Sequence, residues 1–238
     1  MKSILGILLI CCTLGVNAQE KKETPAKKDW SKLDVSKRAS DHLMFQLGYA
    51  AWGNKDGIQT KGFSRTYNMY FLFDFPFKSN PKLSVAVGPG IGTENIFFDK
   101  TTINLADRNG VSFNTDSVTK YKKNKLATGY LEVPLEFRYS SNPENMNSGW
   151  KYALGLKIGT NVDAKVKSKI DLDANNKGGY YLKVKDRRNF NGTRLAATGR
   201  IGYGNMSLFG TYTLTEFFKA GYGPTVKPFT VGLTLSGL

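Results

Sequence analysis

Residues 130–139 read YLEVPLEFRY, and the spacing of side chains in this stretch decides the fold. Every second side chain is apolar, at positions Leu131, Val133, Leu135, Phe137 and Tyr139. The positions between them hold Glu132, Pro134, Glu136 and Arg138. Successive side chains of a strand point to opposite faces, so this segment has one apolar face and one charged face. A helix, with its period of 3.6, would mix the two sets.

The same alternation recurs in seven other segments, at residues 42–52, 66–77, 83–94, 150–159, 194–203, 206–215 and 229–236. The connections between the eight segments are alternately long and short, which is typical of outer-membrane barrels. We therefore predict an all-β fold, an eight-stranded antiparallel up-and-down transmembrane β-barrel. The long connection 99–125 is expected to hold a hairpin with its tip at residues 108–110. The alternation after residue 159 predicts a basic hairpin that projects past the barrel wall.

The start of the chain has the features of a signal peptide. Lys2 precedes an apolar run at residues 4–14, and the small residue Ala18 marks a cleavage site, so 1–18 is predicted to be removed. Both cysteines, Cys11 and Cys12, lie in that run, so the mature chain would have no disulfide and no cysteine metal site. Residues 19–40 are polar and basic and are predicted to form a flexible periplasmic tail. The barrel is predicted to span 41–238.

The composition suits one exported β domain. The 238 residues fit a single closed all-β fold, and no apolar run long enough for a membrane helix occurs after the first segment. The formal net charge is +15. Such a charge is compatible with nucleic acid, anionic lipid or a solvated surface. Because the chain carries an export signal and no nucleic-acid motif, we expect no nucleic-acid partner.

Two kinds of barrel share this alternation, because a soluble barrel of the lipocalin type turns its apolar face inward. Here the polar face is rich in Gly, Ala, Ser and Thr and carries charges of both signs, which suits a narrow lumen. Aromatic residues of the apolar face are expected near the short turns, as a membrane-interface girdle: Phe75, Phe77, Tyr139, Trp150, Tyr152, Tyr203 and Phe229. These features favour a barrel in the outer membrane, with its N- and C-termini in the periplasm.

The polar face supplies a predicted lumen charge network. Its members are Asp74, Glu94, Glu132, Glu136, Arg138, Lys151, Lys157, Arg194 and Arg200. The interior of an eight-stranded barrel is just wide enough for side chains to fill, so these charges suit a structural network. The alternative is a narrow path for ions or small solutes.

The projecting hairpin supplies a second candidate site, for contact with surface lipid. Its cations are Lys165, Lys167, Lys169, Lys183, Lys185, Arg187 and Arg188. They could bind the phosphates of outer-membrane lipid and lipopolysaccharide, because cations near an anionic surface contribute favourable free energy. The alternatives are a solvated loop, or a strand edge that docks a partner protein.

Catalysis and metal binding have little support in the sequence. The one histidine, His42, is expected at the periplasmic end of the first strand, and the spacing shows no catalytic partner for it. We therefore expect no enzymatic activity, no cofactor and no metal site. Three prolines, Pro76, Pro89 and Pro134, fall inside predicted strands, although a closed barrel has no edge to accept a missing N–H.

Several motifs resemble one family. YLEVPLEFRY with its mid-strand proline, the Ala18–Gln19 junction, GPGIG at 88–92 and VGLTLSGL at 231–238 are similar to the PorT-like outer-membrane β-barrel family of Bacteroidota. The resemblance covers residues 41–238. It implies an eight-stranded barrel in the outer membrane, and its named member assists a protein secretion system. It thus points to an interaction or assembly component linked to secretion; the competing hypothesis is a narrow pore or small-solute transporter.

Overall fold

The computed structural model describes residues 42–53, 58, 60, 62–116, 119, 121–145, 148–171 and 179–237. The predicted signal peptide, the predicted tail and the tip of the basic hairpin at 172–178 lie outside this described part. Within it, no helix is long and apolar enough to cross a membrane.

The described residues form strands throughout the fold. In chain order these are β1 (Leu43–Gly53), β2 (Arg65–Phe71), β3 (Phe73–Phe77), β4 (Asn80–Val87), β5 (Gly90–Phe97), β6 (Thr101–Asn104), β7 (Ser112–Thr115), β8 (Tyr121–Ser140), β9 (Trp150–Asp171), β10 (Gly179–Lys185), β11 (Thr193–Tyr203), β12 (Met206–Thr213) and β13 (Lys227–Ser236).

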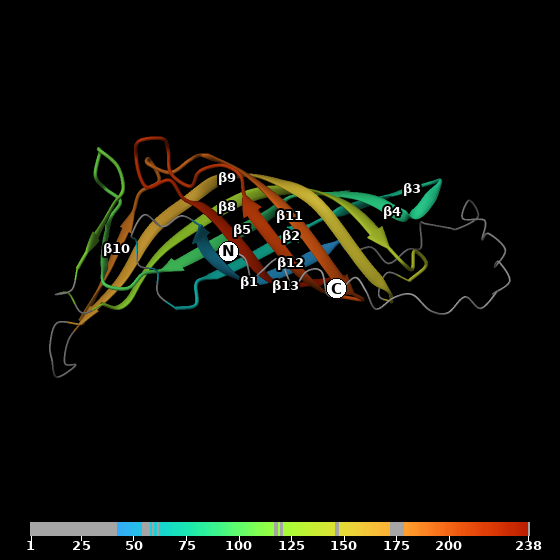
Figure 1. Ribbon diagram of the computed structural model, residues 1–238, viewed down its shortest axis with the longest axis horizontal. Helices are drawn as coiled ribbons and strands as arrows, with labels where there is room; N and C mark the ends of the chain where they lie inside the picture. The colour runs from blue at the N-terminus through green and yellow to red at the C-terminus, as the bar shows by residue number, and fades with distance from the viewer. Residues whose placement is uncertain are drawn as a thin grey trace, which may run out of the picture.

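The strands close into a ring. Going round it, β1, β2, β5, β8, β9, β11, β12 and β13 each pair antiparallel with the next, and β13 pairs back onto β1 (Figure 1). The closing register runs from Met44 opposite Ser236 to Gly53 opposite Lys227. β3 continues the line of β2, and β4 leads into β5, so each of these pairs makes one stave of the wall. The predicted eight-stranded antiparallel barrel is confirmed.

The apolar face of each strand points out of the barrel. On β8, Leu131 and Leu135 are 52% and 51% exposed, whereas Glu132 and Glu136 between them are 3% and 1% exposed. The same alternation holds on the other staves, so Leu, Ile, Val, Phe and Tyr side chains cover the outer wall. A soluble monomer rarely exposes so continuous an apolar surface, which is the surface that hydrocarbon requires.

Aromatic side chains gather at both ends of the outer wall. Near the short turns, the ring of Trp150 lies 5.9 Å from that of Tyr203, and the ring of Tyr139 lies 6.1 Å from that of Tyr152. The placement of Phe229 in this girdle is wrong, because β13 starts at the other end of the barrel, where Phe229 pairs with Tyr212. The exposed rings of Phe63, Tyr212 and Phe229 lie at the long-loop end.

The strand prolines coincide with interruptions of the ladder. The second stave breaks at Leu72 and the third at Gly88 and Pro89, so neither is the continuous strand that the alternation predicts. A Cβ at Gly88 would lie 1.9 Å from the carbonyl oxygen of Phe71, so the two staves approach too closely there for any other residue. Pro134 of β8 lies opposite this break, between the Leu135–Val87 and Glu132–Gly90 pairs. Its missing N–H therefore falls where the neighbouring strand is already interrupted.

Two strands continue far beyond the ring. β8 has 20 residues and begins at Tyr121, well before the predicted start at residue 130, and β9 has 22 residues. Their outer parts pair with each other, and β10 pairs with β9 alongside (Figure 1). The predicted hairpin in the long connection is also present, as β6 and β7 with Ile103 opposite Phe113. The opposite end of the barrel carries the β3–β4 hairpin.

Substitution of an outward residue tests this facing. Leu135→Arg should prevent membrane assembly, because a cation at the middle of the lipid face costs about 2–4 kcal/mol. Leu135→Met keeps an apolar side chain of similar volume and should assemble normally. Folding into bilayers, followed by the heat-dependent shift of the folded band on gels, measures this. Equal assembly of the arginine and methionine variants would contradict the facing.

Candidate functional site

The bore contains a charge cluster near the short-turn end. The Arg138 Nε–H and the Arg200 guanidinium both donate to Oε2 of Glu136, at 2.9 and 2.8 Å. Arg138 also lies 3.6 Å from the carboxylate of Asp74, which accepts a 2.7 Å hydrogen bond from Ser84. These side chains come from β3, β4, β8 and β11, so the cluster ties together staves on different sides of the wall.

A second cluster lies farther along the bore, around Arg194 of β11. Its guanidinium donates to Glu94 at 2.5 Å and to Glu132 at 3.4 Å, and lies over the ring of Tyr130 at 4.7 Å. The Tyr70 hydroxyl donates to the other oxygen of Glu132 at 2.5 Å and accepts a 3.3 Å hydrogen bond from the Lys157 ammonium. The charges of this cluster are thus compensated by close partners, as burial requires.

All nine residues of the predicted lumen set point into the bore. They comprise four carboxylates and five cations, which leaves one net positive charge. Lys151 completes the set near Arg138 and Arg200, where these residues line a cavity of about 10 Å³. A cavity of that size holds about one water molecule. Side chains therefore fill this part of the bore.

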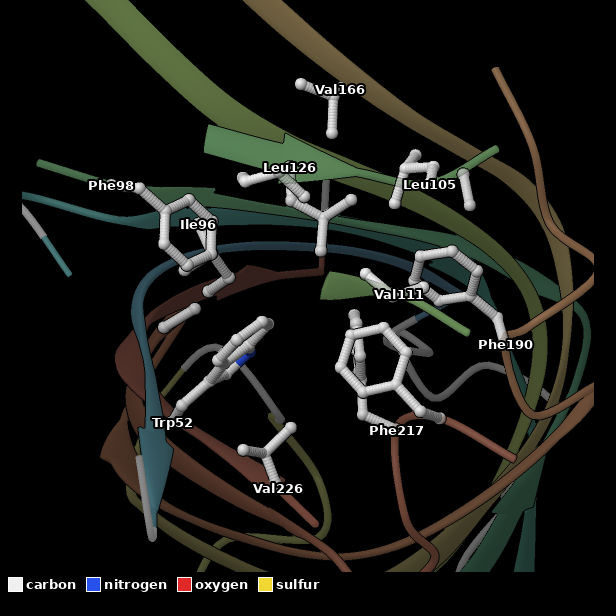
Figure 2. Close-up of a cluster of buried hydrophobic side chains, with 14 residues drawn as sticks. Trp52, Ile96, Phe98, Leu105, Val111, Leu126, Val166, Phe190, Phe217 and Val226 are labelled. Atoms are coloured by element: carbon white, nitrogen blue, oxygen red, sulfur yellow. The ribbon is translucent and has the colours of Figure 1, made fainter. Parts of the chain in front are cut away.

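The long-loop end of the bore is closed by an apolar plug. Trp52, at the end of β1, packs against Phe98 and Phe217, with ring centroids 5.4 and 5.3 Å apart. Phe218 lies 5.0 Å from both Phe190 and Phe217. Figure 2 shows side chains from several strands and loops pointing toward one another inside the ring. The full buried cluster is Ala50, Trp52, Ile96, Phe98, Ile103, Leu105, Val111, Leu126, Ala164, Val166, Phe190, Phe217, Phe218 and Val226.

Loops hold the plug in place. The Val111 N–H donates to the carbonyl of Tyr222 at 2.8 Å, and the Asn189 amide donates to the carbonyl of Asp107 at 2.9 Å. The connection around the β6–β7 hairpin is thereby fixed to the β10–β11 and β12–β13 connections. The sequence reasoning did not identify this plug. Its one signal was that Trp52 and Phe98 continue the inward parity of their strands, where a large aromatic residue is out of place in a polar lumen.

The outer parts of β8, β9 and β10 form a three-stranded extension with two different faces. The inner face, which includes Leu126, Val166 and Val184, packs against the plug. The outer face continues the lipid-facing side of the wall, and we name it the lysine face. Its lysines are Lys123, Lys125, Lys165, Lys167, Lys169, Lys183 and Lys185.

The predicted lipid-contact set overlaps this face only in part. Arg187 donates to the carbonyl of Asn161 at 3.2 Å, and Arg188 pairs with Asp186, so both arginines fix the loop after β10. Lys123 and Lys125 were not in the predicted set, because the sequence placed them in a loop before the fourth strand. The long β8 brings them into register with Lys169 and Lys167.

The one histidine, His42, is in contact with a backbone carbonyl and an aromatic ring. His42 Nδ1 lies 2.8 Å from the carbonyl oxygen of Leu72, and its ring stacks on Phe71 at 5.8 Å. Among the described residues, no group of three or more His, Cys, Asp and Glu side chains could hold a metal ion.

Comparison with known proteins agrees with this architecture. The family described as outer membrane protein β-barrel domain matches residues 15–235. The chain belongs to this family. The barrel is therefore an outer-membrane barrel, and its apolar wall is the surface that meets the lipid.

Solved structures that match this chain include the attachment invasion locus protein Ail of Yersinia pestis. It is 14% identical, with 82% of this chain and 94% of Ail covered and a TM-score of 0.38. The structure of Ail in complex with the heparin analogue sucrose octasulfate gives 13% identity, the same coverage and the same TM-score. No curated protein matches the outer-membrane barrel described here.

Removing a shared carboxylate tests the charge network. Glu136→Ala leaves Arg138 and Arg200 without their common acceptor, and breaking a buried pair in this way costs about 3–5 kcal/mol. We expect the free energy of unfolding to fall by that amount in urea titrations of the barrel in bilayers.

The matched control is Glu144→Ala, which removes an exposed carboxylate at a short turn. Such surface substitutions usually change stability by less than about 0.5 kcal/mol. A Glu136→Ala barrel as stable as the control would contradict the network.

Proposed function

We propose that this protein is a non-conducting, non-enzymatic outer-membrane barrel that serves as an interaction or assembly component of the envelope. The filling of the bore carries this proposal. Salt-bridged side chains occupy its middle and short-turn end, and the aromatic plug closes its long-loop end. A barrel without a transport path performs its function through its surfaces.

A narrow pore is the competing function, and the packing of the bore argues against it. Conduction needs a continuous aqueous path with binding weak enough for ions to leave. Here the carboxylates are held by arginines at hydrogen-bond distance, and Trp52 and its aromatic neighbours lie across the mouth. The fit of side chains in the bore supports a closed lumen.

Two strand edges support the interaction role. Within the described part of the chain, β10 pairs with β9 alone and β3 pairs with β4 alone. Unpaired strand edges are templates on which a partner can add a strand. One edge lies at each end of the barrel, so a partner could bind on either side of the membrane (Figure 1). The resemblance to the PorT-like family makes components of protein secretion the first partners to test.

The absence of catalysis is part of the proposal. The carbonyl of Leu72 and the ring of Phe71 engage His42 at the start of β1. A normal lipid A profile in a deletion strain is the expected result. Loss of one lipid A modification would indicate an enzyme instead.

A closed lumen predicts that the barrel does not conduct ions. The purified barrel, reconstituted in planar bilayers, should give no steady channel openings, because the described side chains of the plug and the charge network occupy the bore. A known porin reconstituted in the same bilayers is the positive control. Reproducible unitary conductance from this chain would favour the pore.

Site-specific photocrosslinking tests the interaction role. A photoreactive phenylalanine analogue at Leu182 on β10, or at Phe75 on β3, should yield protein adducts in cells. The same analogue at Leu154, which faces lipid and is 72% exposed, should not. Mass spectrometry of the adducts identifies the partner. No adduct at either edge, with the barrel correctly assembled, would contradict the role.

A further inference from the structure

We propose that the lysine face binds the phosphate groups of an anionic lipid in the membrane leaflet at the long-loop end. This inference needs only the barrel and its facing, so it does not depend on the closed lumen or on a protein partner. It also extends the site beyond the hairpin itself, to Lys123 and Lys125 of β8 and to Arg65 of β2.

Lysines oppose lysines across the strands of this face. Lys167 on β9 is in register with Lys125 on β8 and with Lys183 on β10. Lys169 is likewise opposite Lys123, and Lys165 is opposite Lys185. Like charges directly opposite each other in a sheet are destabilising. An anion bound across these rows would remove the repulsion.

The face itself supplies little compensation. Asp163 forms ion pairs with Lys165 and Lys185 at one margin of the face. Among the described side chains, no other carboxylate forms an ion pair with a lysine of this face. Burial would raise the pKa of Asp163, but hydrogen bonds from Lys165 and Lys185 lower it below its ordinary value. Asp163 is therefore ionised and already shared by two cations. The row through Lys167 has no such partner on the described strands.

Lys125 lies at the centre of the crowding, on the part of β8 outside the apolar band. Its pKa is lowered by partial burial and by the charges of Lys123, Lys167, Lys165 and Arg65. Its ammonium donates a 2.6 Å hydrogen bond to Asn95 and lies 5.7 Å from the centroid of the Phe97 ring. The groups packed against Lys125 are thus cationic, neutral polar or aromatic. A phosphate among these cations would favour their charged forms.

The position of the face specifies the depth of the ligand. On β8 the outward positions run from Leu131 through Gly129 and Ala127 to Lys125. On β9 they change from apolar at Ile158 to cationic at Lys165. The cations therefore begin directly beyond the apolar band, where the headgroups of a bilayer lie.

A groove beside the lysine face adds an aromatic surface. It has a volume of about 350 Å³ and lies between the start of β2 and the outer part of β8. Its lining includes Phe63, Phe97, Arg65 and Lys123, with the guanidinium of Arg65 5.8 Å from the Phe63 ring centroid. Cations over the exposed Phe63 ring and the half-buried Phe97 ring, beside a wall of apolar side chains, suit an amphiphile with a phosphorylated headgroup. A soluble polyanion would use the charges and leave the adjoining apolar wall unused.

The test uses the full mature barrel purified in a neutral detergent. Mixed micelles carry either a bisphosphorylated lipid A or the same lipid without its phosphates. We expect the wild-type chain to bind the phosphorylated lipid and Lys167→Gln/Lys183→Gln to bind it at least about tenfold more weakly, since each lysine near an anionic surface contributes to binding. Both lysines are exposed, so the double variant should fold normally.

The control variant is Lys78→Gln/Lys219→Gln, which removes the same charge from exposed positions outside the lysine face and should bind as the wild type does. Equal binding by the lysine-face variant, or equal binding of the phosphate-free lipid, would overturn the proposal. Inorganic polyphosphate is the soluble probe. Binding of polyphosphate with retention of no phosphorylated lipid would also overturn it, in favour of a soluble polyanion.

Discussion

The lack of water in the hydrocarbon core is the constraint on which this structure depends. A backbone N–H or C=O exposed to lipid has no partner, so only helices and closed barrels can span a membrane. Here β13 pairs back onto β1 and β8 pairs with both β5 and β9, so the ladder closes round the ring. The three prolines are accommodated because the ladder is interrupted near Gly88 or shifted in register after Pro76.

Closure with eight staves leaves an interior too narrow for bulk water. Charged side chains in such a space need partners, and Glu136 with two arginines and Arg194 with two carboxylates meet that need. Toward the long-loop end, the bore is filled by apolar packing around Trp52 and no longer by ion pairs. The outer surface changes along the same direction, from apolar side chains to the lysine face. The character of the side chains thus changes along the barrel axis, both in the bore and on the outer surface, as well as between alternate residues of a strand.

Alternation along each strand was enough to predict the eight staves, because a period of two is visible in a single sequence. Which face points outward, and hence the nine lumen charges, also needed the composition of the two faces, since a soluble barrel shows the same alternation. Contacts between distant segments were not predictable in this way. The plug joins Trp52 to Phe217 and Phe218, far away in sequence, and no periodic signal links them. The early start of β8 was missed because its outward residues before Gly129 are Ala127, Lys125 and Lys123. Without large apolar side chains, a strand beyond the membrane looks like a loop in the sequence. The error at Phe229 was avoidable, because the last strand begins after a long connection and its first residues therefore lie at the long-loop end.

The central claim is that hydrocarbon contacts one set of alternate side chains on β8 and the filled bore encloses the other. Nitroxide labels placed on single cysteines at residues 131–138, in the barrel reconstituted in bilayers, test it most directly. Collision rates with lipid-soluble oxygen should be high at Leu131, Val133, Leu135 and Phe137 and low at the four positions between them. A profile without a period of two, or one with its maxima at Glu132 and Glu136, would contradict the account.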